Sequence, residues 1–132
     1  MRNKLLPLFS LTTALFSTCA LAAEFHVTNT TELRAAFEST SLNGQEDTIY
    51  LAAGTYKTTD DNIGSFEFTD LETYDITLIG ESKDTVTLDG DATDQVLMFS
   101  FQDRGAAATL ENRTIQNGLR GVKCQNANGV LI

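Results

Sequence analysis

The chain has 132 residues, 18 of them acidic and 9 basic, so its formal net charge is −9 at pH 7. This balance argues against nucleic acid as a partner, because affinity for nucleic acid comes from neutralising phosphates with Lys and Arg. One His and two Cys are too few for a His/Cys zinc site.

The first 22 residues have the three parts of a secretory signal peptide. Arg2 and Lys4 supply the positive start, Leu5–Phe16 is mostly apolar, and Ala20-Leu21-Ala22 gives a small-x-small cleavage pattern. Polar residues interrupt the apolar run, which is shorter than the roughly 20 residues of a membrane span. We therefore expect residues 1–22 to be removed and the protein to be exported to the periplasm, the cell surface or the extracellular medium, with no transmembrane segment after cleavage.

The remaining residues, 23–132, are enough for one domain with its own core. Arg2 and Lys4 are the only charges lost with the signal, which leaves 18 acidic residues against 7 basic ones, a net charge of −11. Cys19 leaves with the signal, so Cys124 cannot form an internal disulfide. Since Cys124 alternates with Val122, we predict a buried, inert thiol on the apolar face of a strand.

One helix is predicted, over Thr30–Thr40, after a short strand at Phe25–Val27. Asn29 is a good N-cap residue, and Glu32 follows three positions later as in a capping box. Leu33, Ala36 and Phe37 then form one apolar stripe.

The rest of the chain reads as short strands separated by Gly, Asn and Asp turns. The predicted strands are Thr48–Leu51, Thr55–Lys57, Ser65–Thr69, Asp75–Leu78, Thr85–Leu88, Val96–Phe101, Ala107–Ile115, Gly121–Cys124 and Val130–Ile132.

Periodicity leaves two arrangements of these strands open. An antiparallel sandwich or barrel is one, with Leu88-Asp89-Gly90-Asp91 as its best hairpin turn. A stack of parallel strands is the other, with apolar residues aligned from one layer to the next. The aligned set would be Ile49, Ile76, Leu78, Val86, Leu88, Leu110, Ile115 and Val130.

Four segments resemble, in order, the opening of right-handed parallel β-helix proteins of the pectin-lyase-like superfamily. They are DTIYLAAGTY at Asp47–Tyr56, ITLIGE at Ile76–Glu81, TVTLDG at Thr85–Gly90 and ATLENRTIQNG at Ala108–Gly118. The resemblance implies an all-β fold, a right-handed parallel β-helix (solenoid) with an N-terminal amphipathic capping helix at Thr30–Thr40. The chain would be the N-terminal portion of such a protein and incomplete at its C-terminus. Its uncapped coil end would allow self-association.

The family contains lyases, hydrolases, esterases and adhesins, so the resemblance specifies the fold better than the activity. No catalytic motif of the family is carried over: His26 is the chain's one histidine, and Gln102-Asp103-Arg104 matches only two residues of an esterase motif. We predict no catalytic residues and no obligatory cofactor for this chain. Pectate-lyase-like members of the family hold calcium with carboxylates, and the closely spaced Asp89, Asp91 and Asp94 are therefore a calcium candidate, with a solvated turn as the favoured interpretation.

Two further groups have structural readings that we prefer to binding. Asn112, Asn117, Asn126 and Asn128 suit left-handed corners between strands. Phe66, Phe68, Phe99 and Phe101 alternate along two strands, where core packing is commoner than a sugar platform.

The leading functional prediction is an exported module with a structural or carbohydrate-contacting surface role, and polysaccharide or cell-surface glycan as its partner. The alternative is the N-terminal part of a polysaccharide lyase or hydrolase whose catalytic coils lie elsewhere.

Overall fold

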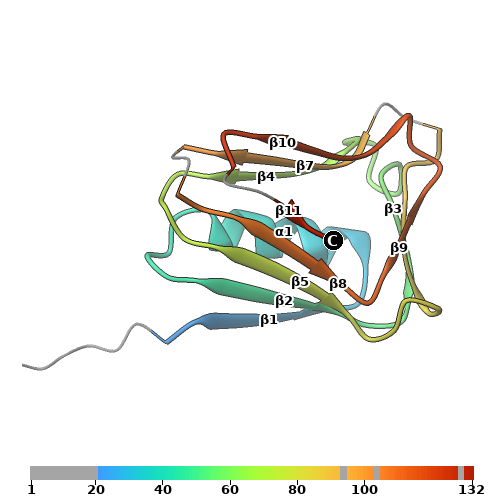
Figure 1. Cartoon of the computed structure of the whole chain (residues 1–132). Helices are drawn as coiled ribbons and strands as arrows, with labels where there is room; N and C mark the ends of the chain where they lie inside the picture. Colours follow the sequence, from blue (N-terminus) through green and yellow to red (C-terminus); the bar gives the residue numbers. More distant parts are fainter. Residues whose placement is uncertain (1–20, 93–94, 103–104, 128–129) are drawn as a thin grey trace, which may run out of the picture.

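The computed structural model describes residues 21–132, apart from residues 93–94, 103–104 and 128–129 (Figure 1). The described chain contains one helix, α1 (Thr30–Thr40), and eleven strands. The strands are β1 (Ala23–Val27), β2 (Asp47–Leu51), β3 (Gly54–Lys57), β4 (Phe66–Asp70), β5 (Ile76–Gly80), β6 (Val86–Asp89), β7 (Gln95–Phe101), β8 (Ala108–Glu111), β9 (Thr114–Gln116), β10 (Arg120–Gln125) and β11 (Val130–Leu131).

The strands form three separate sheets, and every strand pair is parallel. The sheet orders are β1-β2-β5-β8-β11, β3-β6-β9 and β10-β7-β4. No two strands that follow each other directly in the sequence, from β2 onward, belong to the same sheet. This rules out the antiparallel alternative, including a hairpin at Asp89-Gly90.

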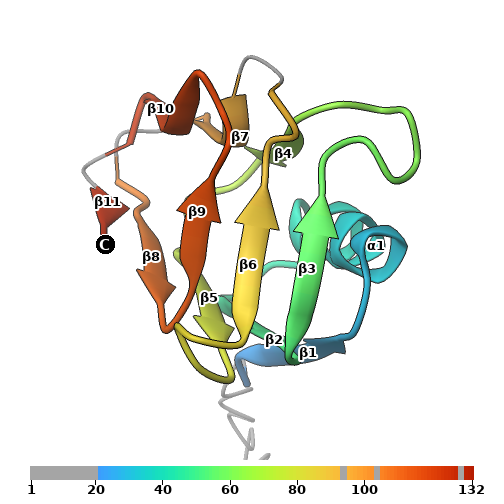
Figure 2. The same cartoon turned by 90° about the vertical axis from the view of Figure 1, so that its right-hand side faces the viewer.

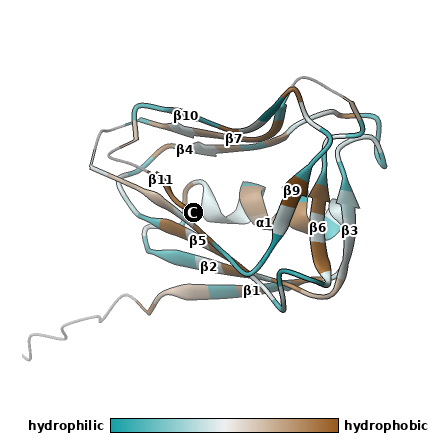
Figure 3. Ribbon diagram, turned by 45° about the vertical axis from the view of Figure 1, so that its right-hand side comes forward, coloured by the Kyte–Doolittle hydropathy of each residue, from teal (hydrophilic) through white to brown (hydrophobic). Residues whose placement is uncertain are grey.

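Side-chain alternation explains why the strands stack in this register. β2 and β5 bury every second residue, and hydrophobic and hydrophilic residues alternate along the strands (Figure 3). Ile49 pairs with Leu78, and Leu78 pairs with Leu110, so one buried row runs through three strands. A shift by one residue would turn that row toward solvent, which is why the apolar pattern specifies the register. The stacked set predicted from the sequence is confirmed at these positions.

Helix α1 begins as the sequence predicts. The Asn29 side chain accepts a hydrogen bond from the Glu32 amide at 2.9 Å. The Glu32 carboxylate in turn accepts from the Thr28 amide and hydroxyl, at 2.7 and 2.9 Å. The bond to Asn29 satisfies an amide group that the first helical turn leaves unpaired. The bonds from Thr28, first of all from its amide, lower the pKa of Glu32.

The predicted fold class, an all-β right-handed parallel β-helix (solenoid) with a capping helix, is wrong. The structure consists of mostly parallel strands in three small, separate sheets together with one helix, which points to an α/β protein. The helix is part of the core: Leu33 is fully buried, and the Phe37 ring lies 5.7 Å from Phe68 and 6.3 Å from Phe99. Short parallel strands give the same alternating pattern in either class, so the sequence pattern could not separate them.

Asn residues turn the chain at the corners. Asn112, Asn117 and Asn126 have φ values of 50°, 55° and 57°, in the left-handed region that Asn tolerates better than most residues. Asn112 divides the single strand predicted over Ala107–Ile115 into β8 and β9. The structural role predicted for these three residues is confirmed, while Asn128 lies outside the described residues.

The prediction of a buried thiol is wrong, because Cys124 is exposed. It pairs with Phe99 on β7 and belongs to β10, which is the last strand of its sheet. The alternation with Val122 was read correctly, but no further described strand covers this edge. Partial desolvation nevertheless raises the pKa of the Cys124 thiol.

Candidate functional site

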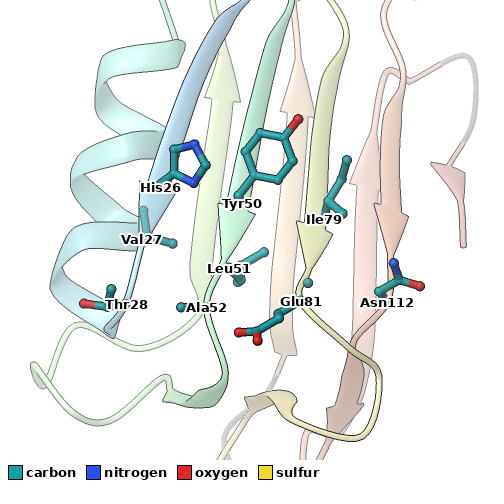
Figure 4. A pocket seen from close by; sticks show the side chains of 10 residues that line it. His26, Val27, Thr28, Tyr50, Leu51, Ala52, Ile79, Glu81 and Asn112 are labelled. Atoms are coloured by element: carbon teal, nitrogen blue, oxygen red, sulfur yellow. The ribbon is translucent and has the colours of Figure 1, made fainter.

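The outer face of the five-stranded sheet carries a row of large side chains. His26 on β1 pairs with Tyr50 on β2, and Tyr50 pairs with Ile79 on β5. The rings of His26 and Tyr50 are stacked, with centroids 4.8 Å apart and planes inclined by 14° (Figure 4). The parallel register places the rings side by side because cross-strand partners lie one strand spacing apart.

A hollow of about 450 Å³ lies along this row, toward the carboxyl ends of the strands. Its walls come from β1, β2 and β5, from the turns that follow them, and from Asn112 after β8. The lining residues are His26, Val27, Thr28, Tyr50, Leu51, Ala52, Ile79, Gly80, Glu81 and Asn112. Most of this surface is apolar, with a few polar groups at the rim, which is the usual composition of a small-molecule site.

Tyr56 supports the hollow from the interior. Its side chain is fully buried, and its hydroxyl shares its one hydrogen between the carbonyls of Val27 and Ala52, at 3.0 and 2.9 Å. These two carbonyls lie at the ends of β1 and β2, so one hydroxyl ties together the two strands that carry the stacked rings. Burial raises the pKa of Tyr56 to about 12, which keeps the hydroxyl protonated and able to donate.

Gly80 lines the hollow where the chain approaches Asn112. A β-carbon placed on Gly80 would lie 2.0 Å from the Asn112 carbonyl oxygen, so no side chain fits there. The close approach brings the Asn112 corner of one layer against β5 of another. Asn112 is exposed, and it lines the hollow together with Glu81.

The polar rim includes one carboxylate held by the backbone. Glu81 accepts a hydrogen bond from the Ala53 amide at 3.0 Å, which fixes it beside β2. Glu111 is also exposed and follows Ile79 in the same cross-strand row. The surroundings of the hollow are therefore negatively charged or neutral, which favours a neutral ligand over an acidic one.

The calcium candidate has a different local explanation. Asp89 is buried, and its carboxylate accepts from the side-chain amides of Gln116 and Asn117, each at 2.9 Å, and from the Asp91 amide at 2.8 Å. These bonds, led by that from Gln116, lower the pKa of Asp89. The Asp91 carboxylate accepts separately from the Thr59 hydroxyl at 2.7 Å.

Asp94 lies outside the described residues, as does the Asp103-Arg104 part of the esterase-like stretch. Among the residues that the structure describes, no group of three His, Cys, Asp or Glu side chains is arranged to hold a metal ion. The calcium site stays a prediction.

The four alternating phenylalanines pack in the core and form no platform on the surface. Phe66, Phe68, Phe99 and Phe101 are all buried, and Phe68 stacks edge-on against Phe101 at 6.0 Å, so the preferred core-packing interpretation is confirmed. The stack of His26 on Tyr50 was not predicted from the sequence. Both residues occupy outward-facing positions of their alternating strands, and that alternation can be read from the sequence. Their contact cannot, because it depends on a strand register that pairs residues 24 positions apart.

No family model matches this chain, and no match was found among the curated proteins or the solved structures. The resemblance to the pectin-lyase-like superfamily therefore stays a prediction. Across the described part of the chain, no helix is both long enough and apolar enough to span a membrane.

Proposed function

We propose that this protein is an exported, non-catalytic module that contacts neutral carbohydrate through the outer-face hollow. The observation that carries the proposal is the stack of the nearly parallel His26 and Tyr50 rings beside an apolar hollow with a polar rim. A pyranose ring has an apolar face of C–H groups that packs on aromatic rings, and its hydroxyls need polar partners at the edge. Thr28, Glu81 and Asn112 stand where such partners are required.

A neutral glycan suits the charge of the protein. The chain carries a formal charge of −9, and Glu81 lies within the hollow itself. An acidic polysaccharide would be repelled by this field, most strongly at low ionic strength. We infer that neutral polysaccharides bind better than uronic-acid polymers of the same length.

The alternative, a polysaccharide lyase or hydrolase, would need catalytic groups beyond those of the hollow. Hydrolysis of a glycoside requires two carboxyl groups flanking one bond. Glu81 is the one carboxylate that lines the hollow as described. Assaying the same polysaccharides for newly formed reducing or unsaturated ends distinguishes this alternative from binding.

The test is binding of soluble neutral polysaccharides, measured by affinity electrophoresis and calorimetry, with Tyr50→Ala as the main variant. We expect a loss of roughly tenfold in affinity, since one lost stacking contact is worth about 1–1.5 kcal/mol. Tyr50→Phe keeps the ring and should bind as the native protein does.

Tyr74 provides the matched control, because it is an exposed tyrosine that does not line this hollow. Tyr74→Ala should leave the affinity unchanged. Equal affinities of the native protein and Tyr50→Ala would refute the proposed site.

A further inference from the structure

Three carboxylates gather where the five-stranded sheet begins. Asp47 starts β2, Asp70 ends β4 and Glu72 follows it, and the first two are 4% and 2% exposed. The Asp70 carboxylate accepts a hydrogen bond from the Glu72 amide at 2.8 Å, and the Glu72 carboxylate accepts one from the Gly44 amide at 2.7 Å. Burial first of all, together with the charges of Glu72 and Asp70, raises the pKa of Asp47. We call Asp47, Asp70 and Glu72 the acidic cluster.

Within the described part of the chain, no basic side chain pairs with the acidic cluster. The ion pair found there joins Arg34 to Asp61. Oδ2 of Asp70 is buried and has no hydrogen-bond partner. A buried carboxylate oxygen without a partner is costly, and nearby like charges add to the cost. A cationic hydrogen-bond donor beside the cluster would relieve both penalties.

The first strand begins next to this cluster. Ala23, the first residue of β1, pairs with Asp47, and its nitrogen donates to the Glu46 carbonyl at 3.1 Å. Figure 1 shows the start of β1 on the same side of the molecule as the turns that lead into β2 and β5. A hollow of about 310 Å³ lies at this point, lined by Ala22, Gln45, Glu46 and Tyr74.

The expected signal cleavage falls at the same place. Ala20-Leu21-Ala22 predicts cleavage after Ala22, and both Ala22 and Leu21 are exposed. Hydrolysis of the Ala22–Ala23 peptide bond by a signal peptidase consumes one water molecule. Its hydroxyl group goes to the Ala22 carbonyl carbon and its hydrogen to the Ala23 nitrogen. The freed amine takes up a further proton at neutral pH, because an α-amino group has an ordinary pKa of about 7.7–8.0.

We propose that the ammonium group created at Ala23 is the cation that the acidic cluster lacks, so that removal of residues 1–22 stabilises the folded protein. In the uncleaved chain the same nitrogen is a neutral amide, and its one hydrogen is donated to the Glu46 carbonyl. An ammonium group has three hydrogens and a positive charge, so it can keep that bond and also bind Asp47. The inference rests on the export part of the proposed function and not on carbohydrate binding.

The other charged groups around the start of β1 do not compete for this role. Helix α1 packs against β1 and β2, and its one basic residue, Arg34, is paired with Asp61. The remaining titratable side chains near this point are all exposed and none is basic: Glu24, Glu38, Glu46, Tyr74 and Asp75. The field at the new ammonium group is therefore negative from each described element packed there.

The test uses the protein purified after export. N-terminal sequencing should give Ala23 as the first residue. Cyanate at about pH 6 carbamylates the α-amino group in preference to lysine, whose amine is protonated there, and mass spectrometry verifies a single modification. Carbamylation removes the positive charge, so we expect the melting temperature at pH 7 to fall by roughly 4 °C. The difference should vanish toward pH 10, where the unmodified amine has also lost its proton.

Two variants test whether the acidic cluster is the partner. Asp47→Asn removes the charge and keeps the oxygen that accepts from Asn43 at 2.7 Å. Carbamylation of this variant should lower its melting temperature by less than half of the native shift. Glu111→Gln, at an exposed carboxylate near the other end of the same sheet, is the control and should show the full shift. Circular dichroism verifies folding, and Glu72→Gln replaces Asp47→Asn if that variant does not fold.

Equal melting temperatures before and after carbamylation at pH 7 would overturn the inference, and so would a difference that persists at pH 10. Shifts of equal size in Asp47→Asn and Glu111→Gln would show that the carbamyl group acts elsewhere than on the cluster. A first residue other than Ala23 would also overturn it. None of these results touches the carbohydrate proposal, which stands or falls with Tyr50→Ala.

Discussion

Two ends of the molecule differ in how completely their apolar residues are covered. One carries α1, and the other is formed by β9, β10 and β11 (Figure 2). At the first, Leu33 and Phe37 lie at 0% and 3% exposure. At the second, Ile115, Val122 and Val130 are only partly buried. Strand alternation thus provides a stack with an inside and an outside, but a separate element is needed to close each end of it.

The largest expected effect comes from removing the contact that the Phe37 side chain of α1 makes with the core. Phe37→Ala should lower the free energy of unfolding by about 3–5 kcal/mol, because it leaves a cavity against Phe68 and Phe99. Val122→Ala on β10 should cost about 1 kcal/mol or less, since solvent fills the space. Urea denaturation of both variants measures the difference. Equal losses would show that the two ends are closed alike.

Arg34 supplies a second contact that is found at the end carrying α1. From α1 it donates to the carbonyls of Thr58, Gly64 and Ser65, forms an ion pair with Asp61, and lies 4.8 Å above the Phe66 ring. One planar guanidinium therefore ties the segment between β3 and β4 to the helix, a geometry that Lys cannot reproduce.

Arg34→Lys should cost about 2 kcal/mol and expose residues 58–65 to proteolysis before global unfolding. Arg120→Lys on β10 serves as the matched control and should change neither quantity. Identical digestion patterns for the native protein and Arg34→Lys would contradict the assigned role.

A smaller effect is expected at two buried carboxylates, whose contributions to stability should change with pH in opposite directions. Burial raises the pKa of Asp70, whose Oδ2 has no hydrogen-bond partner among the described residues, while hydrogen bonds, first of all from Gln116, lower the pKa of Asp89. The ordinary value for both is 3.8. A raised folded pKa means that Asp70 contributes more stability as the pH falls toward 3.8. A lowered one means that Asp89 contributes stability above 3.8 and loses it as the pH falls below that value.

At pH 7, Asp70→Asn should therefore stabilise the protein and Asp89→Asn should destabilise it, each by about 1 kcal/mol. Melting temperatures from pH 7 down to pH 3 provide the measurement, and the deficit of Asp89→Asn should shrink at the acidic end. Shifts of the same sign in both variants at pH 7 would contradict this assignment.

Much of the local structure could be predicted from the sequence because its causes are local. The cap at Asn29, the apolar stripe of α1 and the left-handed Asn112 and Asn117 each follow from neighbouring residues. The fold class was predicted wrongly, since whether short strands make one solenoid or three separate sheets, and whether a helix only caps the core or belongs to it, depends on long-range packing. The exposure of Cys124 and the His26–Tyr50 stack were missed for the same reason: both depend on which strand lies next to which.

The strand registers also determine where the chain can vary in length. Ile49 is 29 residues from its partner Leu78, and Leu78 is 32 residues from its partner Leu110, yet the three side chains align in one row. The unequal spacing is absorbed at the corners, outside the paired segments. Insertions and deletions at those corners are therefore nearly neutral for the core, while they reshape the rims of surface hollows such as the one that includes Glu81 and Asn112. Descendants of this chain can acquire new binding preferences by changing corner lengths while the stacked interior is inherited intact.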